Sequence, residues 1–296
     1  MRITQSMLAA NSLRNISSSY ERLSKLQDQL STGKKITKPS DDPVVAMKGM
    51  YYRSDLTGVE QYKRNLSELH LWMDNSEAGM SEANSVLQRV RELLVQGQND
   101  TLSPTDRNAI AVEVGQLNQD LVKTANTQVA GKYIFHGTDV TKPPVPQEDP
   151  PLVAANLTDP KINSYNVEVS KGVFLKANVN PANTFNQELF DVVGKIQTAL
   201  KTNDSSALQG LMVDLDKVTN NLSTERSELG ARTNRLDLVE NRIGQQEVLA
   251  NKVLSDNEDA DIEKVIMDMT TQESVQRAAL SVGSRIIQPT LMDFLR

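Results

Sequence analysis

Between Leu208 and Ala250 the chain reads LQGLMVDLDKVTNNLSTERSELGARTNRLDLVENRIGQQEVLA, and an apolar residue returns at every seventh position. Apolar heptads of this length are typical of a long helix that packs a narrow seam against a partner helix. A second register, half a heptad away, is interrupted by three polar residues: Glu225, Arg232 and Gln246. We therefore predict one very long helix over residues 204–255, with a seam that narrows in its middle.

The partner for this helix lies in the first half of the sequence. Residues 62–97 carry apolar heptads in two interleaved registers, which predicts a helix of about 50 Å at 1.5 Å per residue. A second helix is predicted from Pro104, because Ser103 can cap it and the short polar link before it lets the chain double back. Residues 185–200 predict a shorter amphipathic helix. The predicted rod seam comprises Leu66, Met73, Met80, Leu87, Leu215, Leu222, Leu229, Leu236 and Ile243.

The middle of the chain differs in composition. Prolines are frequent between residues 138 and 181, which precludes long helices there. Apolar residues alternate from Tyr165 to Val169 and again from Val173 to Val179, on either side of a Ser-Lys-Gly turn, which predicts a β-hairpin. A lone hairpin is marginal in water, so we expect a small β-rich insert with further support.

Thin amphipathic helices are predicted at both ends of the sequence. Each carries an apolar stripe too narrow to be stable alone, so we expect the two ends to need each other or neighbouring molecules. The predicted assembly stripe comprises Ile16, Leu23, Leu30, Ile262, Ile266, Val275, Ala279, Val282 and Ile286. We expect the N-terminal members to pair with the C-terminal ones.

These elements predict a mainly α chain: an elongated multi-helix rod with long heptad helices from both ends and a small β-rich insert. The predicted domains are a terminal coiled-coil domain (residues 1–42 with 256–296), a helical-bundle rod (43–138 with 182–255) and a β-rich outer insert (139–181). Only 38% of the 296 residues are hydrophobic, which favours helices with one buried stripe over a thick core.

Composition also excludes several classes of function. The net charge of −6 argues against a protein that binds duplex DNA. The absence of cysteine excludes a disulfide framework, a thiolate zinc site and a cysteine nucleophile. The sequence shows neither the layout of a secretory signal nor an apolar run of membrane-spanning length, so we expect no membrane partner and export, if any, by another route.

No set of residues predicts catalysis, a cofactor or a metal. The two histidines, His70 and His136, are far apart in sequence and lack a recognised ligand spacing, so a helix-flank role for His70 is favoured over a metal-binding role. The segment STGKKITK lacks the pattern of a phosphate-binding loop. Asp41 and Asp42 precede Pro43, and we expect Ser40 or Asp41 to cap the helix that follows rather than to serve as an acid or base. The acidic run at residues 255–259 is interpreted as a solvated break between helices.

Several stretches resemble a known family. The opening MRITQSML, the segment LSTGKKITKPSDDPVVA (residues 30–46) and the ending from Ile262 through QESVQRAALSVGSRIIQPTLMDFLR (residues 262–296) resemble the two ends of the bacterial flagellin superfamily. The stretch GKYIFHGTDV (131–140) is more similar to the members at the junction between hook and filament than to flagellin itself. The resemblance implies a nested architecture in which the two chain ends pair and the middle of the chain projects outward.

The resemblance also implies a function and partners. The expected protein is a secreted structural adaptor of the extracellular flagellum, several copies of which form a junction ring on which flagellin assembles. Its expected partners are other copies of itself, the preceding hook-associated junction protein, flagellin, the type III export apparatus and an export chaperone.

Two alternatives remain open from the sequence. A small flagellin, the filament subunit, would have the same fold and the same ends. A cytoplasmic coiled-coil scaffold or signalling protein would also show long heptads and no catalytic set, but it would not need matched amphipathic ends around a proline-rich insert. An enzyme is the least supported class.

Overall fold

The computed structural model describes residues 5–99, 102–154 and 164–287. Contacts within the chain divide it into two units. The terminal unit combines both chain ends, residues 1–58 and 246–296, and the central unit comprises residues 59–245. The mainly α class, with long helices from both ends and only small antiparallel sheets, is confirmed.

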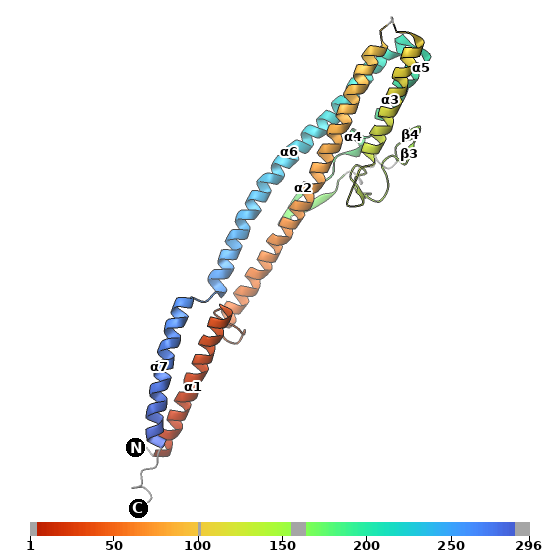
Figure 1. Cartoon of the computed structure of the whole chain (residues 1–296). Coiled ribbons are helices and arrows are strands. Elements are labelled where there is room, and N and C mark those ends of the chain that lie inside the picture. Colours follow the sequence, from red (N-terminus) through yellow and green to blue (C-terminus); the bar gives the residue numbers. More distant parts are fainter. Residues whose placement is uncertain (1–4, 100–101, 155–163, 288–296) are drawn as a thin grey trace, which may run out of the picture. The chain divides into compact units, whose positions relative to one another are not determined.

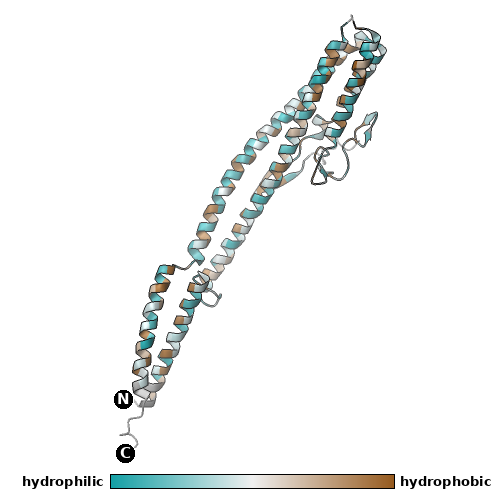
Figure 2. Cartoon of the chain, in the orientation of Figure 1, coloured by the Kyte–Doolittle hydropathy of each residue, from teal (hydrophilic) through white to brown (hydrophobic). Residues whose placement is uncertain are grey.

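The central unit is built on two long helices, α2 (Pro43–Gly97) and α6 (Ser205–Glu258). Residues 43–58 of α2 and 246–258 of α6, here called the outer ends of these helices, belong to the terminal unit. The shorter helices α3 (Pro104–Ala125) and α5 (Gln187–Thr202) complete it, together with the one-turn α4 (Pro181–Thr184) (Figure 1). Apolar residues form stripes along these helices (Figure 2). All nine residues of the predicted rod seam are at most 1% exposed and lie in one hydrophobic cluster. The heptads therefore build the core of the central unit.

Capping residues and prolines mark where helices α3 and α2 begin. The Ser103 side chain accepts a hydrogen bond from the Asp106 N–H and Pro104 opens α3, as the sequence predicts. In addition, the Ser103 N–H donates a hydrogen bond to the Asp106 carboxylate, which completes a capping box. The predicted cap of α2 is wrong. Asp42, not Ser40 or Asp41, accepts hydrogen bonds from the N–H groups of Val44 and Val45 at 2.9 and 3.1 Å. Pro43 then occupies the first helical position, so α2 begins well before the heptads at residue 62.

The described residues between α3 and α4 form three two-stranded antiparallel sheets. They pair β1 (Gln128–Val129) with β2 (Lys132–Tyr133), β3 (Gln147–Glu148) with β4 (Pro151–Leu152), and β5 (Asn166–Ser170) with β6 (Val173–Lys176). The last pair is the predicted hairpin, which is confirmed, and Gly172 takes a positive φ of 74° in its turn.

The hairpin packs against the helices. One face of it, with Val169, Leu175 and Ala177, belongs to the same hydrophobic cluster as the rod seam. The Asn65 side chain of α2 donates a hydrogen bond to the Glu168 carbonyl at 2.8 Å. This contact supplies the support that a lone hairpin lacks.

The terminal unit contains α1 (Gln5–Thr32) and α7 (Ile262–Ile287), which lie side by side (Figure 1), and the outer ends of α2 and α6. The domain boundaries predicted at residues 42, 138, 181 and 255 stay a prediction. Within the described part of the chain, every helix lacks the long apolar stretch that a bilayer crossing requires.

Candidate assembly surface

The contact between α1 and α7 includes buried polar residues and a glycine. The Gln272 side chain donates a hydrogen bond to the Ser19 hydroxyl at 2.8 Å, and both Ser19 and Gln276 are buried. Gly283 lies against Ile16, since a Cβ at Gly283 would be 3.4 Å from the Ile16 Cδ1. Within the described residues of the terminal unit, Val265 is the only buried hydrophobic residue. The two helices therefore pair while burying little apolar surface.

The expected pairing of the N-terminal stripe with the C-terminal one is wrong for three C-terminal residues, whereas Ile16 of the N-terminal stripe does lie against α7, at Gly283. Ile262, Ile266 and Val282 are 40%, 44% and 56% exposed, so each leaves much of its side chain outside the contact with α1. The side of α7 that faces α1 carries Val265, Gln272, Gln276 and Gly283 instead. On α7 the sequence pattern misled because the side that meets α1 includes Gln272, Gln276 and Gly283, and the exposed apolar residues of α7 lie beside it.

The exposed apolar residues of α7 lie on both flanks of this contact. At about 100° per residue, Ile262, Ile266 and Leu280 fall on one side of the line that faces α1, and Val275 and Val282 fall on the other. The Ile286 side chain lies outside the described residues, and Ala279 is half-buried near the contact. On α1, Ile16, Leu23 and Leu30 are half-buried. The helix pair thus presents two apolar flanks.

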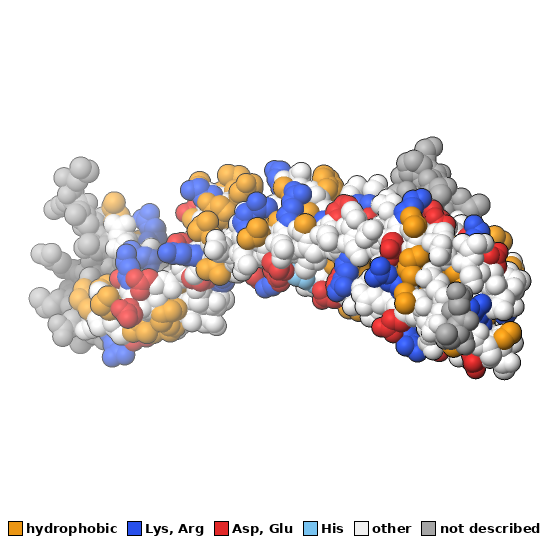
Figure 3. Space-filling view, turned by 90° about the horizontal axis from the view of Figure 1, so that it is seen from above, with side chains coloured by type: hydrophobic (Ala, Val, Ile, Leu, Met, Phe, Trp, Pro, Cys, Tyr) orange, Lys and Arg blue, Asp and Glu red, His pale blue; other side chains and the backbone are white. Residues whose placement is uncertain are grey.

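Large exposed hydrophobic residues are concentrated in the terminal unit. They continue from α1 and α7 onto the outer ends of α2 and α6, and patches of hydrophobic side chains are visible on the molecular surface (Figure 3). Surfaces of this kind mark sites of protein interaction. Besides the α7 residues named above, the large exposed hydrophobic residues of the terminal unit are Met7, Leu13, Tyr20, Val44, Met47, Met50, Tyr51, Val248, Leu249 and Met267.

A charged cluster holds the segment that follows α1 to the end of α6. Lys34 Nζ lies 2.7 Å from Asp259 Oδ1, and Arg53 lies 2.8 Å from the buried Glu258 carboxylate. The hydrogen bond between Lys34 and Asp259 raises the pKa of Lys34 and lowers the pKa of Asp259. Gly49 leaves room for Glu258, since a Cβ there would lie 2.5 Å from Glu258 Oε1. The interpretation of residues 255–259 as a solvated break is therefore wrong, because α6 continues to Glu258 and that residue is buried.

A second buried charge, on α6 in the central unit, was visible in the sequence only as an interruption of the heptads. The Glu225 carboxylate, 2% exposed, accepts hydrogen bonds from the Asn180 N–H at 2.8 Å and from Arg232 at 3.1 Å. Arg232 also donates to the Asn178 carbonyl. These charges anchor the segment between β6 and α4 on α6, because a buried carboxylate is stable only when paired and hydrogen-bonded.

The histidines occupy two different environments. His136 is buried with Ile134 and Phe135, and its Nδ1 lies 2.7 Å from the Lys142 carbonyl oxygen. His70 is part-exposed on α2 and lies next to two carboxylates of α6. Residues 134–137 of the segment GKYIFHG are therefore buried in the central unit, where Phe135 packs edge-on against Phe185 at 4.8 Å between ring centroids.

Comparison with known proteins places this chain in a family. The profile for the bacterial flagellin N-terminal helical region matches residues 3–139, and the profile for the C-terminal helical region matches residues 212–295. Flagellar hook-associated protein 3 of Escherichia coli strain K12 is 25% identical over 300 residues, which cover 94% of this chain and 95% of that protein. Flagellin of Bacillus subtilis strain 168 is 26% identical over 286 residues, 94% of each chain.

A solved structure supports the same fold. A flagellar hook-associated protein from Vibrio parahaemolyticus, 20% identical, superposes with a TM-score of 0.66 over 74% of this chain and 100% of that chain. Its helical fold agrees with the helices described here, and both family profiles fall on the two ends of the sequence that form the terminal unit and the long helices. The chain belongs to the bacterial flagellin family.

Proposed function

We propose that this chain is a structural adaptor of the bacterial flagellum that forms the junction between hook and filament, the surface on which flagellin assembles. Several copies associate in a ring through the terminal unit. The role involves packing and no catalysis. The members of the assembly stripe (Ile16, Leu23, Leu30, Ile262, Ile266, Val275, Ala279, Val282 and Ile286) are proposed to lie in or beside the contacts between copies.

The observation that carries this proposal is the pair of apolar flanks on α7. A helix pair with one exposed apolar flank would suit a dimer, whereas apolar flanks on both sides suit a subunit with a neighbour on each side, as in a ring. Burial of these side chains stabilises the contact by about 25 cal/mol for each Å² of apolar surface removed from water. This gain offsets the entropy that the chain ends lose when they are ordered by neighbouring copies.

The choice of the junction over the filament rests on resemblance. A full-length relative and the solved structure described above are named as hook-associated proteins. The resemblance of the stretch GKYIFHGTDV to junction members favours the same choice. The proposed partners are further copies of the chain, the preceding junction protein and flagellin. Export through the flagellar type III apparatus, with a chaperone, would bring the chain to the outside of the cell.

Deletion of the gene tests the proposal directly. Electron microscopy of the deletion strain should show hooks without filaments, with flagellin released into the medium. Restoration of filaments by the full-length chain is the control. Normal filaments on the deletion strain would contradict the proposal.

The second candidate is a filament subunit, because Bacillus subtilis flagellin matches 94% of this chain at an identity similar to that of hook-associated protein 3. Copy number distinguishes the two. Quantitative mass spectrometry of sheared appendages should find this chain at a small fraction of the flagellin level. Thousands of copies per filament, or long filaments formed by the purified chain alone, would favour the filament subunit.

A further inference from the structure

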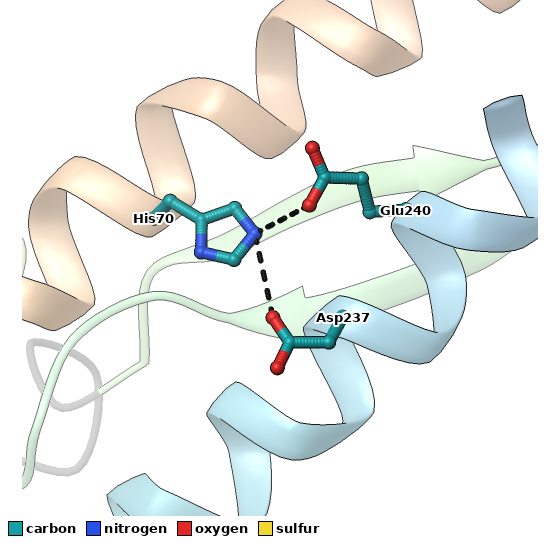
Figure 4. Close-up of side chains that lie close together, drawn as sticks. All are labelled: His70, Asp237 and Glu240. Atoms are coloured by element: carbon teal, nitrogen blue, oxygen red, sulfur yellow. Dashed lines mark hydrogen bonds and ion pairs between the residues drawn. The ribbon is translucent and has the colours of Figure 1, made fainter.

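His70 of α2 lies between two carboxylates of α6 within the central unit. Its Nε2 is 2.9 Å from Glu240 Oε2 and 3.7 Å from Asp237 Oδ1. One ligand atom from each of the three residues lies within 4.8 Å of the other two. Figure 4 shows that both carboxylates point at the same ring nitrogen, while the other ring nitrogen points away from them. We propose that His70, Asp237 and Glu240 bind a divalent transition-metal ion of the Zn²⁺ type.

The positions of the three residues suit such a site. Asp237 and Glu240 are three residues apart on α6, so they lie on the same helix face, and His70 faces them from α2. Donors bound to Zn²⁺ at about 2.0–2.2 Å in a tetrahedron are roughly 3.4 Å apart. The two measured distances from His70 Nε2 lie on either side of this value. Small rotations of the side chains would therefore place all three donors around one ion.

The charges and the donor types point to the class of ion. Two carboxylates converge on one imidazole, and within the described chain neither has an ion pair with a lysine or arginine. A divalent cation would neutralise both negative charges. Imidazole nitrogen favours Zn²⁺ and similar metals, whereas Mg²⁺ and Ca²⁺ prefer oxygen ligands alone. Three protein ligands would leave a coordination position for water.

The site is accessible to an ion from solvent. The side chains of His70, Asp237 and Glu240 are 25%, 54% and 50% exposed. A bound ion would link α2 to α6 at the edge of the rod seam and stabilise the central unit, because it would bind the folded chain and not the unfolded one. The proposal is independent of the function proposed above.

Titration of the tag-free full-length chain with Co²⁺, after removal of metals with a chelator, tests the proposal. We expect one Co²⁺ per chain, with the visible absorption of a nitrogen- and oxygen-coordinated ion, and displacement by Zn²⁺ but not by Mg²⁺. His70→Gln should weaken binding at least tenfold, since residues that only orient a metal ligand already contribute about 10- to 100-fold to affinity. Asp237→Asn and Glu240→Gln should each weaken it as well.

Glu68→Gln is the matched control. Glu68 is exposed on α2 two residues from His70, about 200° around the helix, so this variant should bind Co²⁺ like the unmodified chain. Circular dichroism should show that all variants keep their helices. The proposal is overturned if the unmodified chain takes up no Co²⁺, or if His70→Gln binds it with unchanged affinity.

Discussion

The central and terminal units are both made of long amphipathic helices, yet they bury their apolar residues to very different extents. In the central unit, heptad residues of α2 and α6 join a continuous core with α3, α5 and the β5–β6 hairpin. In the described part of the terminal unit only Val265 is a buried hydrophobic residue. An apolar stripe therefore predicts a contact but not whether the partner is in the same chain. The stripes of the central unit are completed within the molecule, and those of the terminal unit are proposed to be completed by other copies.

The largest expected effect is on assembly. Val282→Asp places a charge on one apolar flank of α7, where Val282 is 56% exposed, and should abolish incorporation into the flagellum. Complementation of the deletion strain, with electron microscopy of the appendages, measures this loss. The purified variant should keep the helicity and thermal midpoint of the unmodified chain, because more than half of the side chain is already exposed in the monomer.

Two further variants sharpen this test. Ser281→Asp adds the same charge to the adjacent residue, which is exposed and lies about 160° from the side of α7 that faces α1, and should assemble normally. Ile266→Asp places the charge on the opposite flank and should block assembly as Val282→Asp does. If only one of the two flanks matters, a ring with equivalent neighbours on both sides is the wrong arrangement.

The next largest effect concerns the stability of the central unit. Leu222→Ala removes a fully buried seam side chain and should lower the free energy of unfolding by about 2–5 kcal/mol. Urea unfolding followed by the fluorescence of Trp72, the single tryptophan, reports on this unit. Leu249→Ala, at an exposed leucine of the terminal unit, should change the Trp72 transition by no more than about 0.5 kcal/mol. Equal losses in the two variants would remove the distinction between the units.

A smaller effect is expected at a close contact within the central unit. A Cβ at Gly79 would lie 2.8 Å from the ring of the buried Phe135. Gly79→Ala should therefore destabilise the central unit by about 1–2 kcal/mol, because the overpacking costs more than the better helix propensity of alanine gains. Gly230→Ala, in α6 with no heavy atom near its Cβ, should instead stabilise it by up to about 1 kcal/mol. The same urea titration compares the two variants, and a stabilising Gly79→Ala would contradict the packing of Phe135.

The smallest effect is the pH dependence of the ion pair between Lys34 and Asp259. Because the pKa of Asp259 is lowered from its ordinary value of 3.8, Asp259 contributes stability above pH 3.8, and this stability is lost as the pH falls through the pKa of the folded state. Because the pKa of Lys34 is raised from its ordinary value of 10.5, Lys34 contributes stability below pH 10.5, and this stability is lost as the pH rises through the pKa of the folded state. Both groups are nearly half exposed, so the pair contributes at most about 1 kcal/mol.

Lys34→Met tests this pair. Its thermal midpoint, followed by circular dichroism, should fall below that of the unmodified chain between about pH 5 and 9. The difference should shrink below pH 3.8 and in high salt. A difference that persists undiminished at low pH would show that the methionine acts through packing and not through lost charge.

Features set by neighbouring residues could be predicted from the sequence. The α3 capping box, the turn at Gly172 and the heptad positions of α2 and α6 depend on residues within a few positions of each other, or on a regular repeat. The class of the fold followed from them.

Features that depend on distant residues could not be predicted in the same way. Glu258 is buried because Gly49 leaves space for it and Arg53 supplies the charge, and these residues come from the other end of the sequence. The side of α7 that meets α1 carries Gln272 and Gly283, which no apolar pattern reveals. The cluster at His70 likewise depends on two residues of α6 that approach it only in the fold.

Hydrogen exchange of the purified monomer, read by mass spectrometry along the full chain, tests most directly whether the terminal unit depends on other copies. Amides of α1 and α7 should exchange orders of magnitude faster than those of α2 and α6 within residues 59–245, because few apolar contacts hold the terminal helices. The same amides should become protected when the chain is incorporated into flagella. Equal protection of the two units in the monomer would contradict the account.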